Sequence, residues 1–191
     1  MRDERLVECF VASFEKLDHM TVLSKESDPV AWQLAVGNGD RYGHKSWRPK
    51  RVGTSRALVE PIYCQLPGPF PPLFERMVLS FRWAEVDIQV CQLLANPPGT
   101  DLSGLLKVMS KDRTLWKFLR ESGYIQFGRG SGGDYDPVCF DVSSWKNSLD
   151  YKVVKIDHEE ILCHDRVKVV AELAPSFRDL MLRTIDKANQ T

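Results

Sequence analysis

The sequence predicts an α+β fold with a central, mainly antiparallel sheet flanked by helices. Two apolar runs, Tyr124–Phe127 and Val138–Phe140, are joined by a segment rich in glycine and aspartate, which is typical of a β-hairpin. A third apolar run, Lys152–Ile156, follows after a polar loop and supplies a further strand. Helical and strand patterns are mixed without a regular βαβ period, and this irregular order favours an antiparallel sheet.

Helical patterns lie on both sides of these strands. Residues Glu4–Leu17 place apolar side chains at helical spacing, which predicts an amphipathic helix. A cap followed by a proline predicts a short helix over Val30–Val36, ended by Gly37. Further helices are expected over Leu73–Trp83, Leu102–Met109, Arg113–Ser122 and from Pro175 to about Ala188, and Val86–Leu94 is expected to be a strand or loop.

The composition indicates one large domain or a domain with an N-terminal extension. The chain has 191 residues, of which 43% are apolar, enough for a substantial core. Lys plus Arg and Asp plus Glu both number 26, so no net charge draws the chain toward nucleic acid or an anionic membrane. No apolar run approaches the roughly 18 residues of a membrane span.

The cysteines indicate a reducing compartment. The five are scattered and form no Cys-x-x-Cys pair, so neither a zinc knuckle nor a redox motif is expected. Cys139 and Cys163 follow apolar residues and are expected to be buried structural thiols. The N-terminus also lacks the apolar core of a signal peptide. These features predict a soluble, cytoplasmic protein.

A basic segment, Gly37–Arg56, separates the first helices from the rest. Its cationic residues, interleaved with Tyr42 and Trp47, are Arg41, Lys45, Arg48, Lys50, Arg51 and Arg56. Such a segment could hold a nucleic-acid strand or a phosphate, but the neutral chain favours an irregular arm with solvated charges. We therefore expect residues 1–56 to be an N-terminal helical extension with a basic loop, and residues 57–191 to be the main α+β domain.

The chain carries no complete catalytic motif. The glycine-rich run Gly128–Gly133 lacks the lysine of a Walker motif and is followed by Asp134, Tyr135, Asp136 and Pro137, so a turn is favoured over a phosphate loop. Cys139 with His158 or His164 could form a nucleophile–base pair, but a strand interior favours a structural thiol. Neither an enzyme nor a bound cofactor is predicted.

Acidic residues near the hairpin suggest a metal-binding site as an alternative. Asp134, Asp136, Asp157, His158 and Glu159 have the side chains of a metal-dependent hydrolase or a cation-binding domain. They lack the spacing of a calcium loop and of His-Glu-x-x-His, so no metal ligands are assigned. Asp157 at a strand end is expected instead to cap the following turn.

The order of several short motifs resembles the SUKH superfamily, the group of a yeast regulator of cell-wall synthesis and killer-toxin resistance and of bacterial toxin-immunity proteins. These motifs are Leu66-Pro67, Pro71-Pro72-Leu73-Phe74-Glu75, Gly123–Gly128, Asp134–Asp141, Val153–Glu159 and Ala174-Pro175-Ser176-Phe177, within about Glu60 to Ile185. The resemblance implies an α+β domain with no catalytic residues to carry over. Bacterial members look like immunity proteins, and eukaryotic members like interaction or regulatory modules.

The sequence therefore predicts a non-enzymatic module that binds a partner protein, either a toxin such as a nuclease or a regulatory, cell-wall or signalling factor. Arg129, Asp134, Tyr135 and Trp145 combine aromatic and charged groups, as the centres of interfaces commonly do. In an immunity role, Asp134 and Asp136 could block the phosphate site of a nuclease.

Overall fold

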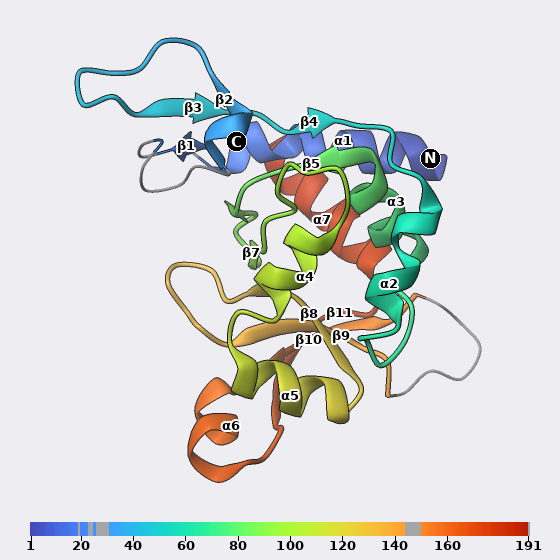
Figure 1. The fold of residues 1–191 in the computed structure, drawn as a ribbon. Coiled ribbons are helices and arrows are strands. Elements are labelled where there is room, and N and C mark those ends of the chain that lie inside the picture. The colour runs from blue at the N-terminus through green and yellow to red at the C-terminus, as the bar shows by residue number, and fades with distance from the viewer. Residues whose placement is uncertain (19, 23–24, 26–30, 144–149, 191) are drawn as a thin grey trace.

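The computed structural model describes residues 1–18, 20–22, 25, 31–143 and 150–190, and it confirms the α+β fold (Figure 1). The helices are α1 (Asp3–Leu17), η1 (Ala31–Leu34), η2 (Arg56–Leu58), α2 (Glu60–Tyr63), α3 (Pro72–Ser80), α4 (Ser103–Met109), α5 (Arg113–Glu121), α6 (His158–His164) and α7 (Phe177–Ala188), where η marks a 3-10 helix. Within the described residues, none of these helices has the length and hydrophobicity needed to cross a bilayer.

The strands form one large sheet and two small ones. The strands are β1 (Thr21–Val22), β2 (Ala35–Val36), β3 (Lys45–Trp47), β4 (Lys50–Arg51), β5 (Phe81–Arg82), β6 (Val86–Asp87), β7 (Gln92–Leu93), β8 (Tyr124–Arg129), β9 (Pro137–Asp141), β10 (Lys152–Ile156) and β11 (Val169–Ala174). The large sheet has the order β11-β10-β9-β8-β7-β6, and every pairing in it is antiparallel. The predicted hairpin and third strand are thus the adjacent central strands β8, β9 and β10.

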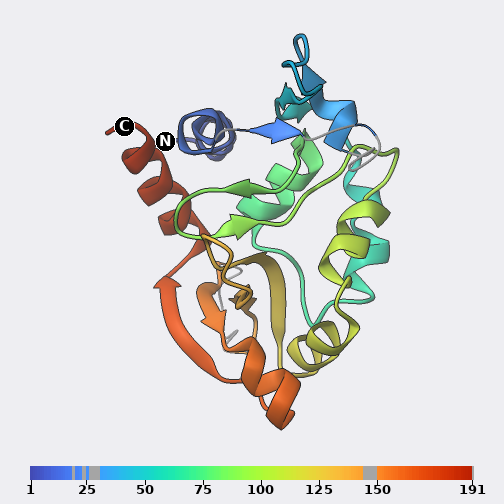
Figure 2. The same cartoon turned by 90° about the vertical axis from the view of Figure 1, so that its left-hand side faces the viewer.

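Helices cover both faces of the large sheet. In Figures 1 and 2, α1, α3 and α7 lie on one side of it, and α5 and α6 lie on the other. The side chains agree: Val153 belongs to the main core together with residues of α1, α3 and α7, whereas Val154 packs in a second cluster with residues of α5 and α6. Successive residues of a strand point to opposite faces, so β10 contributes to both cores.

Five phenylalanine side chains lie together at the centre of the main core. The ring of Phe74, on α3, lies with its centroid 5.1 to 5.7 Å from those of Phe70, Phe127, Phe140 and Phe177. Phe127 and Phe140, neighbours across β8 and β9, are stacked at 4.1 Å. Edge-to-face and offset contacts of this kind add stabilisation beyond the burial of apolar area. The cluster joins the sheet to α3 and α7.

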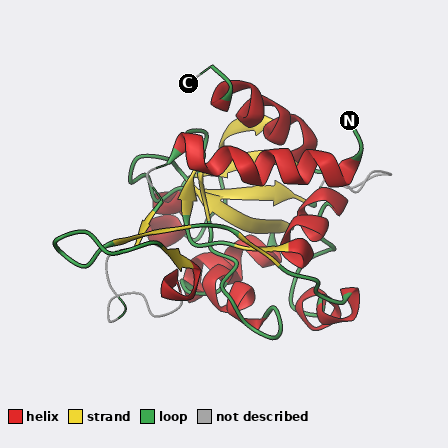
Figure 3. Ribbon diagram, turned by 90° about the horizontal axis from the view of Figure 1, so that it is seen from above, coloured by secondary structure: helices red, strands yellow, loops and turns green. Residues whose placement is uncertain are grey.

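The first helix belongs to the same core. Phe10, at 0% exposure, lies with its ring centroid 6.0 Å from that of Phe177 and extends the cluster to α1. α1 and α7 pack side by side and run in the same general direction (Figure 3), with Arg178 bound to Asp3 at one end and Lys16 bound to Asn189 at the other. The N-terminal segment is therefore anchored to the body of the protein through α1.

Two helix boundaries differ from the predictions. The short helix expected over Val30–Val36 is present in part: residues 31–34 form the 3-10 helix η1, and residues 35–36 form β2 instead of continuing the helix. The helix expected over Leu73–Trp83 ends at Ser80, and the chain continues as β5. Arg82 Nη1 and Asn96 Nδ2 both donate to the carbonyl of Val78, so buried side chains satisfy a carbonyl in the last turn of α3.

Replacing Phe74 with alanine should lower the free energy of unfolding by about 3–5 kcal/mol, because it removes the ring at the centre of the cluster and leaves a cavity. Urea denaturation monitored by circular dichroism would measure this change. Phe118→Ala, at a half-buried position on α5, is the matched control and should cost clearly less. Equal losses for the two variants would show that the cluster is not the centre of stability.

Candidate functional site

The loop between β8 and β9, residues 130–136, is closed by hydrogen bonds within itself. The amide of Gly130 donates to the carbonyl of Asp136 at 2.9 Å, and Asp134 Oδ1 accepts from the amide of Asp136 at 2.9 Å. The carboxylate of Asp134 lies directly over Gly130, where any side chain would overlap it. Gly132 and Gly133 have φ angles of 69° and 88°, which glycine adopts without strain. The glycines thus form the tight turn that the sequence predicted.

A cationic side chain from β10 joins the two aspartates of the loop. Lys155 Nζ lies 2.9 Å from Asp134 Oδ2 and 3.6 Å from Asp136 Oδ2. Asp136 Oδ1 also accepts from the amide of His158 at 3.0 Å and lies 2.8 Å from His158 Nδ1. The loop is therefore attached both to the neighbouring strand and to the first turn of α6.

These contacts favour the charged forms of Asp134 and Lys155. The amide of Asp136 and then the ammonium of Lys155 hold the pKa of Asp134 below its ordinary value. The hydrogen bond to Asp134 raises the pKa of Lys155. Both groups are consequently ionised near neutral pH. The ammonium of Lys155 therefore compensates much of the negative charge that the aspartates give the loop.

The opposite side of the loop is attached to the hairpin of β6 and β7. Arg129 Nη2 donates to Glu85 Oε2 at 2.8 Å, and Arg129 Nε donates to Gln92 Oε1 at 2.8 Å. Ser131 Oγ donates to Asp87 Oδ2 at 2.5 Å. Arg129 therefore orients the base of the loop and is itself only partly available to a partner.

The five residues predicted to contact a partner have different environments. Tyr135 is 67% exposed, and its ring centroid lies 6.3 Å from that of His158. Arg129, Asp134 and Asp136 lie beside it but are engaged in the contacts described above. Trp145 falls outside the described residues. Tyr135 is thus the largest accessible apolar group on the loop.

The geometry gives little support to the alternative of a metal-dependent hydrolase or cation-binding domain. Of its five candidate ligands, Asp136 and His158 are in side-chain contact, whereas the carboxylate of Asp134 is engaged with the backbone amide of Asp136 and with Lys155. Asp157 instead caps α6, as predicted, by accepting from the amides of residues 159 and 160. Across the described residues, no group of three or more His, Cys, Asp or Glu side chains is arranged to hold a metal ion.

Cys139 and Cys163 have different environments in the structure. Cys139 is fully buried, and burial raises the pKa of its thiol well above the ordinary value, so it remains protonated. The prediction that Cys163 is buried was wrong, because its side chain lies on the exposed side of α6. His164, the other candidate base, is exposed at the end of the same helix.

The basic segment at residues 37–56 is mostly paired. Arg48 binds Glu15, and Arg51 binds Glu4 and Glu8. These three glutamates lie on α1. Other contacts join Arg56 to Glu75, Arg41 to the Tyr42 ring and Lys45 to the Trp32 ring. These pairings favour the structural interpretation of the segment over nucleic-acid binding.

Sequence reasoning missed the residues that fix the loop, namely Lys155, Glu85 and Asp87. A lysine inside the apolar run Val153–Ile156 was a usable signal for Lys155, since a charge in such a strand requires a partner. Glu85 and Asp87 gave no comparable signal, because their contact with the loop depends on how β6 and β7 join the sheet.

Replacing Lys155 with methionine should destabilise the protein near neutral pH by less than about 1 kcal/mol, because the pair is partly screened by water. The pKa of Asp134 is held below 3.8, so its stabilising contribution is present above that value and is lost as the pH falls through its lowered pKa. Urea midpoints of variant and parent should therefore converge below about pH 3.8. Lys107→Met, at an exposed position on α4, should show no such dependence, and a pH-independent difference for Lys155→Met would contradict the account.

Replacing Asp157 with alanine should cost about 1 kcal/mol of stability, whereas Asp157→Asn should cost much less, because asparagine retains the cap acceptor. Thermal unfolding of the two variants distinguishes a cap from a site that requires a carboxylate. An equal loss for both variants would speak against the capping role.

Comparisons with known proteins found no match. No protein-family model, curated protein or solved structure matches the chain with significant similarity. What the protein does is therefore inferred from its own residues.

Proposed function

We propose that the chain is a non-enzymatic protein-binding module that presents Tyr135, on the β8–β9 loop, to a partner protein. The observation that carries this proposal is the combination of a 67% exposed aromatic ring with a loop fixed on both sides. An exposed tyrosine on a flexible loop would lose conformational entropy on binding. A fixed loop avoids most of that cost.

The surroundings of Tyr135 suit the centre of an interface. Tyrosine is enriched at such centres because it buries a large ring and keeps a hydroxyl for hydrogen bonding. Asp134 and Lys155 have side chains that are 35% and 28% exposed and that compensate each other in charge. They would form a polar rim around the ring rather than a patch of one sign.

Two partner classes follow from the SUKH-like motifs: a toxin, such as a nuclease, or a regulatory factor of cell-wall synthesis or signalling. The paired state of Asp134 and Asp136 bears on the first class. A partner that used these carboxylates as phosphate mimics would have to compete with Lys155 and His158 for them. We therefore assign recognition primarily to Tyr135 and its rim.

Site-specific photo-crosslinking tests this proposal. A benzophenone amino acid at position 135, introduced into the full chain and irradiated in lysate of the source cells, should give a discrete covalent adduct with a partner protein. The same group at Tyr42, which is 66% exposed, is the matched control. Equal adducts at both positions, or none at position 135, would contradict the assigned surface.

With the captured partner purified, Tyr135→Ala should weaken its binding by at least about tenfold, the effect of losing roughly 1.4 kcal/mol at an interface centre. Tyr42→Ala should leave the affinity unchanged. Isothermal titration calorimetry measures both, and an unchanged affinity for Tyr135→Ala would remove Tyr135 from the interface.

A further inference from the structure

The outward face of α5 carries a stripe of cationic side chains. Arg113, Lys117 and Arg120 recur at the i, i+4 and i+7 spacing that aligns residues along one side of a helix. Leu115 and Leu119 are buried on the opposite side, in the second core cluster. The three cationic residues are exposed, and α5 lies at the surface over one face of the large sheet (Figures 1 and 2). This α5 stripe therefore faces solvent.

Ion pairs do not neutralise the α5 stripe within the described part of the chain. None of its three residues forms a salt bridge with a described acid, whereas Arg48 and Arg51 both bind glutamates of α1. Lys117 Nζ lies 5.6 Å from the centroid of the Phe118 ring, a contact that leaves its charge uncompensated. The neighbouring Asp112 caps α5 by accepting from the amides of residues 114 and 115.

The arrangement is unfavourable for α5 itself. Arg113 is the first residue of the helix, where the macrodipole favours an acidic residue, and the first turn holds none. Lys117 lies four residues after Arg113 and three before Arg120, and like charges at these spacings destabilise a helix. Stability alone would favour a glutamate at position 113. A local choice that costs stability is typical of residues that serve binding.

The chemistry of the α5 stripe fits an acidic protein segment better than a nucleic acid or a lipid surface. Single-stranded nucleic acids stack on exposed aromatic rings, and Trp116 and Phe118 of α5 are half-buried. The chain also has no net charge to attract a polyanion from a distance. Insertion into a membrane would require the apolar face of α5, but Leu115 and Leu119 are already packed in the core.

We propose that the α5 stripe is a docking surface for an acidic segment of a partner protein. Carboxylates three or four residues apart on a helical segment would match the spacing of Arg113, Lys117 and Arg120. Guanidinium groups bind carboxylates through paired hydrogen bonds of defined geometry, so the arginines at the two ends of the stripe can orient the segment. The stripe lies on a different element from Tyr135, and its test does not require the partner of that loop.

Titration of the ¹⁵N-labelled full-length protein with a peptide of Glu-Glu-Ala-Ala repeats tests the proposal, because this peptide places glutamates both three and four residues apart. Saturable chemical-shift changes are expected in α5 at low ionic strength, and binding should weaken at about 0.15 M salt, where exposed charges are screened. The same peptide with glutamine in place of glutamate should not bind. Saturable shifts confined to other elements, no saturation, or equal binding of the two peptides would overturn the proposal.

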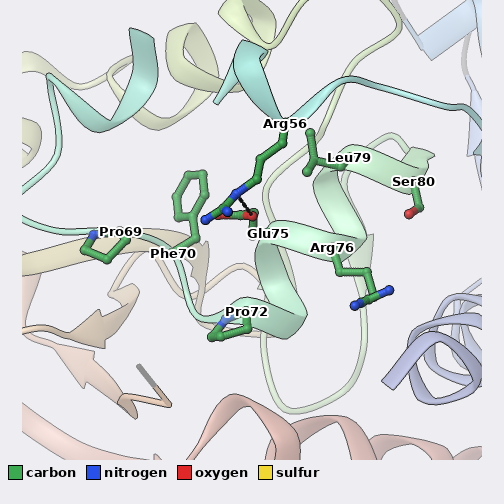
Figure 4. A pocket seen from close by; sticks show the side chains of 8 residues that line it. All are labelled: Arg56, Pro69, Phe70, Pro72, Glu75, Arg76, Leu79 and Ser80. Atoms are coloured by element: carbon green, nitrogen blue, oxygen red, sulfur yellow. Dashed lines mark ion pairs between the residues drawn. The ribbon is translucent and has the colours of Figure 1, made fainter. Parts of the chain in front are cut away.

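Arg113→Glu should weaken binding of the glutamate peptide by about fivefold or more, because it replaces an attractive charge with a repulsive one. Arg76→Glu, at an exposed arginine that forms no salt bridge with a described acid, is the matched control and should bind as the parent does. Arg76 lines a pocket beside α3 with Arg56 and Glu75, and Figure 4 shows its side chain directed away from that ion pair. Equal weakening in both variants would indicate a general charge effect and overturn the assignment.

The same substitution separates loss of binding from loss of folding. Arg113→Glu places an acid in the first turn of α5 and removes the repulsion from Lys117, so the midpoint of thermal unfolding should rise by about 1–4 °C. A lower midpoint would contradict the inference that Arg113 is kept at a cost to stability.

Two further titrations test the position and the partner class. Tyr135→Ala should leave binding of the glutamate peptide unchanged, and a loss as large as that of Arg113→Glu would place the acidic segment at the β8–β9 loop instead. A single-stranded oligodeoxynucleotide of mixed sequence should bind more weakly than the peptide. Tighter binding of the oligonucleotide, with a steep dependence on salt and a loss in Arg113→Glu, would assign the α5 stripe to nucleic acid and overturn the proposal.

Discussion

The contact on which the rest of the structure depends is the packing of Phe74 against four other phenylalanine rings. It brings α3 onto β8 and β9, and Phe177 and Phe10 extend it to α7 and α1. Because these rings are almost completely buried, the cluster holds the central hairpin against α3 and α7. The contacts of the β8–β9 loop lie outside this cluster and involve polar and charged side chains.

The β8–β9 loop is held in place by charged side chains from neighbouring elements. Strand pairing places Lys155 opposite Val138, next to the loop, and this position lets one ammonium group bind both aspartates. Asp157 starts α6 so that the amide and ring of His158 face Asp136. Charges that would otherwise repel one another thereby hold the turn closed, and Tyr135 remains as the exposed group.

The sequence predicted the three central strands and the longer helices, but not how the elements meet. Alternating apolar runs and glycine turns identified β8, β9 and β10, and the Asp157 cap was also visible from residue type and position. The end of α3 was missed because Arg82 and Asn96 satisfy the carbonyl of Val78 in its last turn, which is a tertiary effect. Likewise, the acidic residues looked like metal ligands because their compensation by Lys155 depends on strand register. Pockets such as the one beside α3 have no sequence signature.

The most direct test of the account is the backbone mobility of residues 130–136 in the free protein, measured by ¹⁵N relaxation. If Lys155 and His158 fix the loop, its order parameters should be close to those of the adjoining strands, about 0.85. They should fall in Lys155→Met while those of β8 and β9 stay unchanged. Order parameters below about 0.6 in the parent protein would mean that the loop is flexible, and they would contradict a preorganised binding surface.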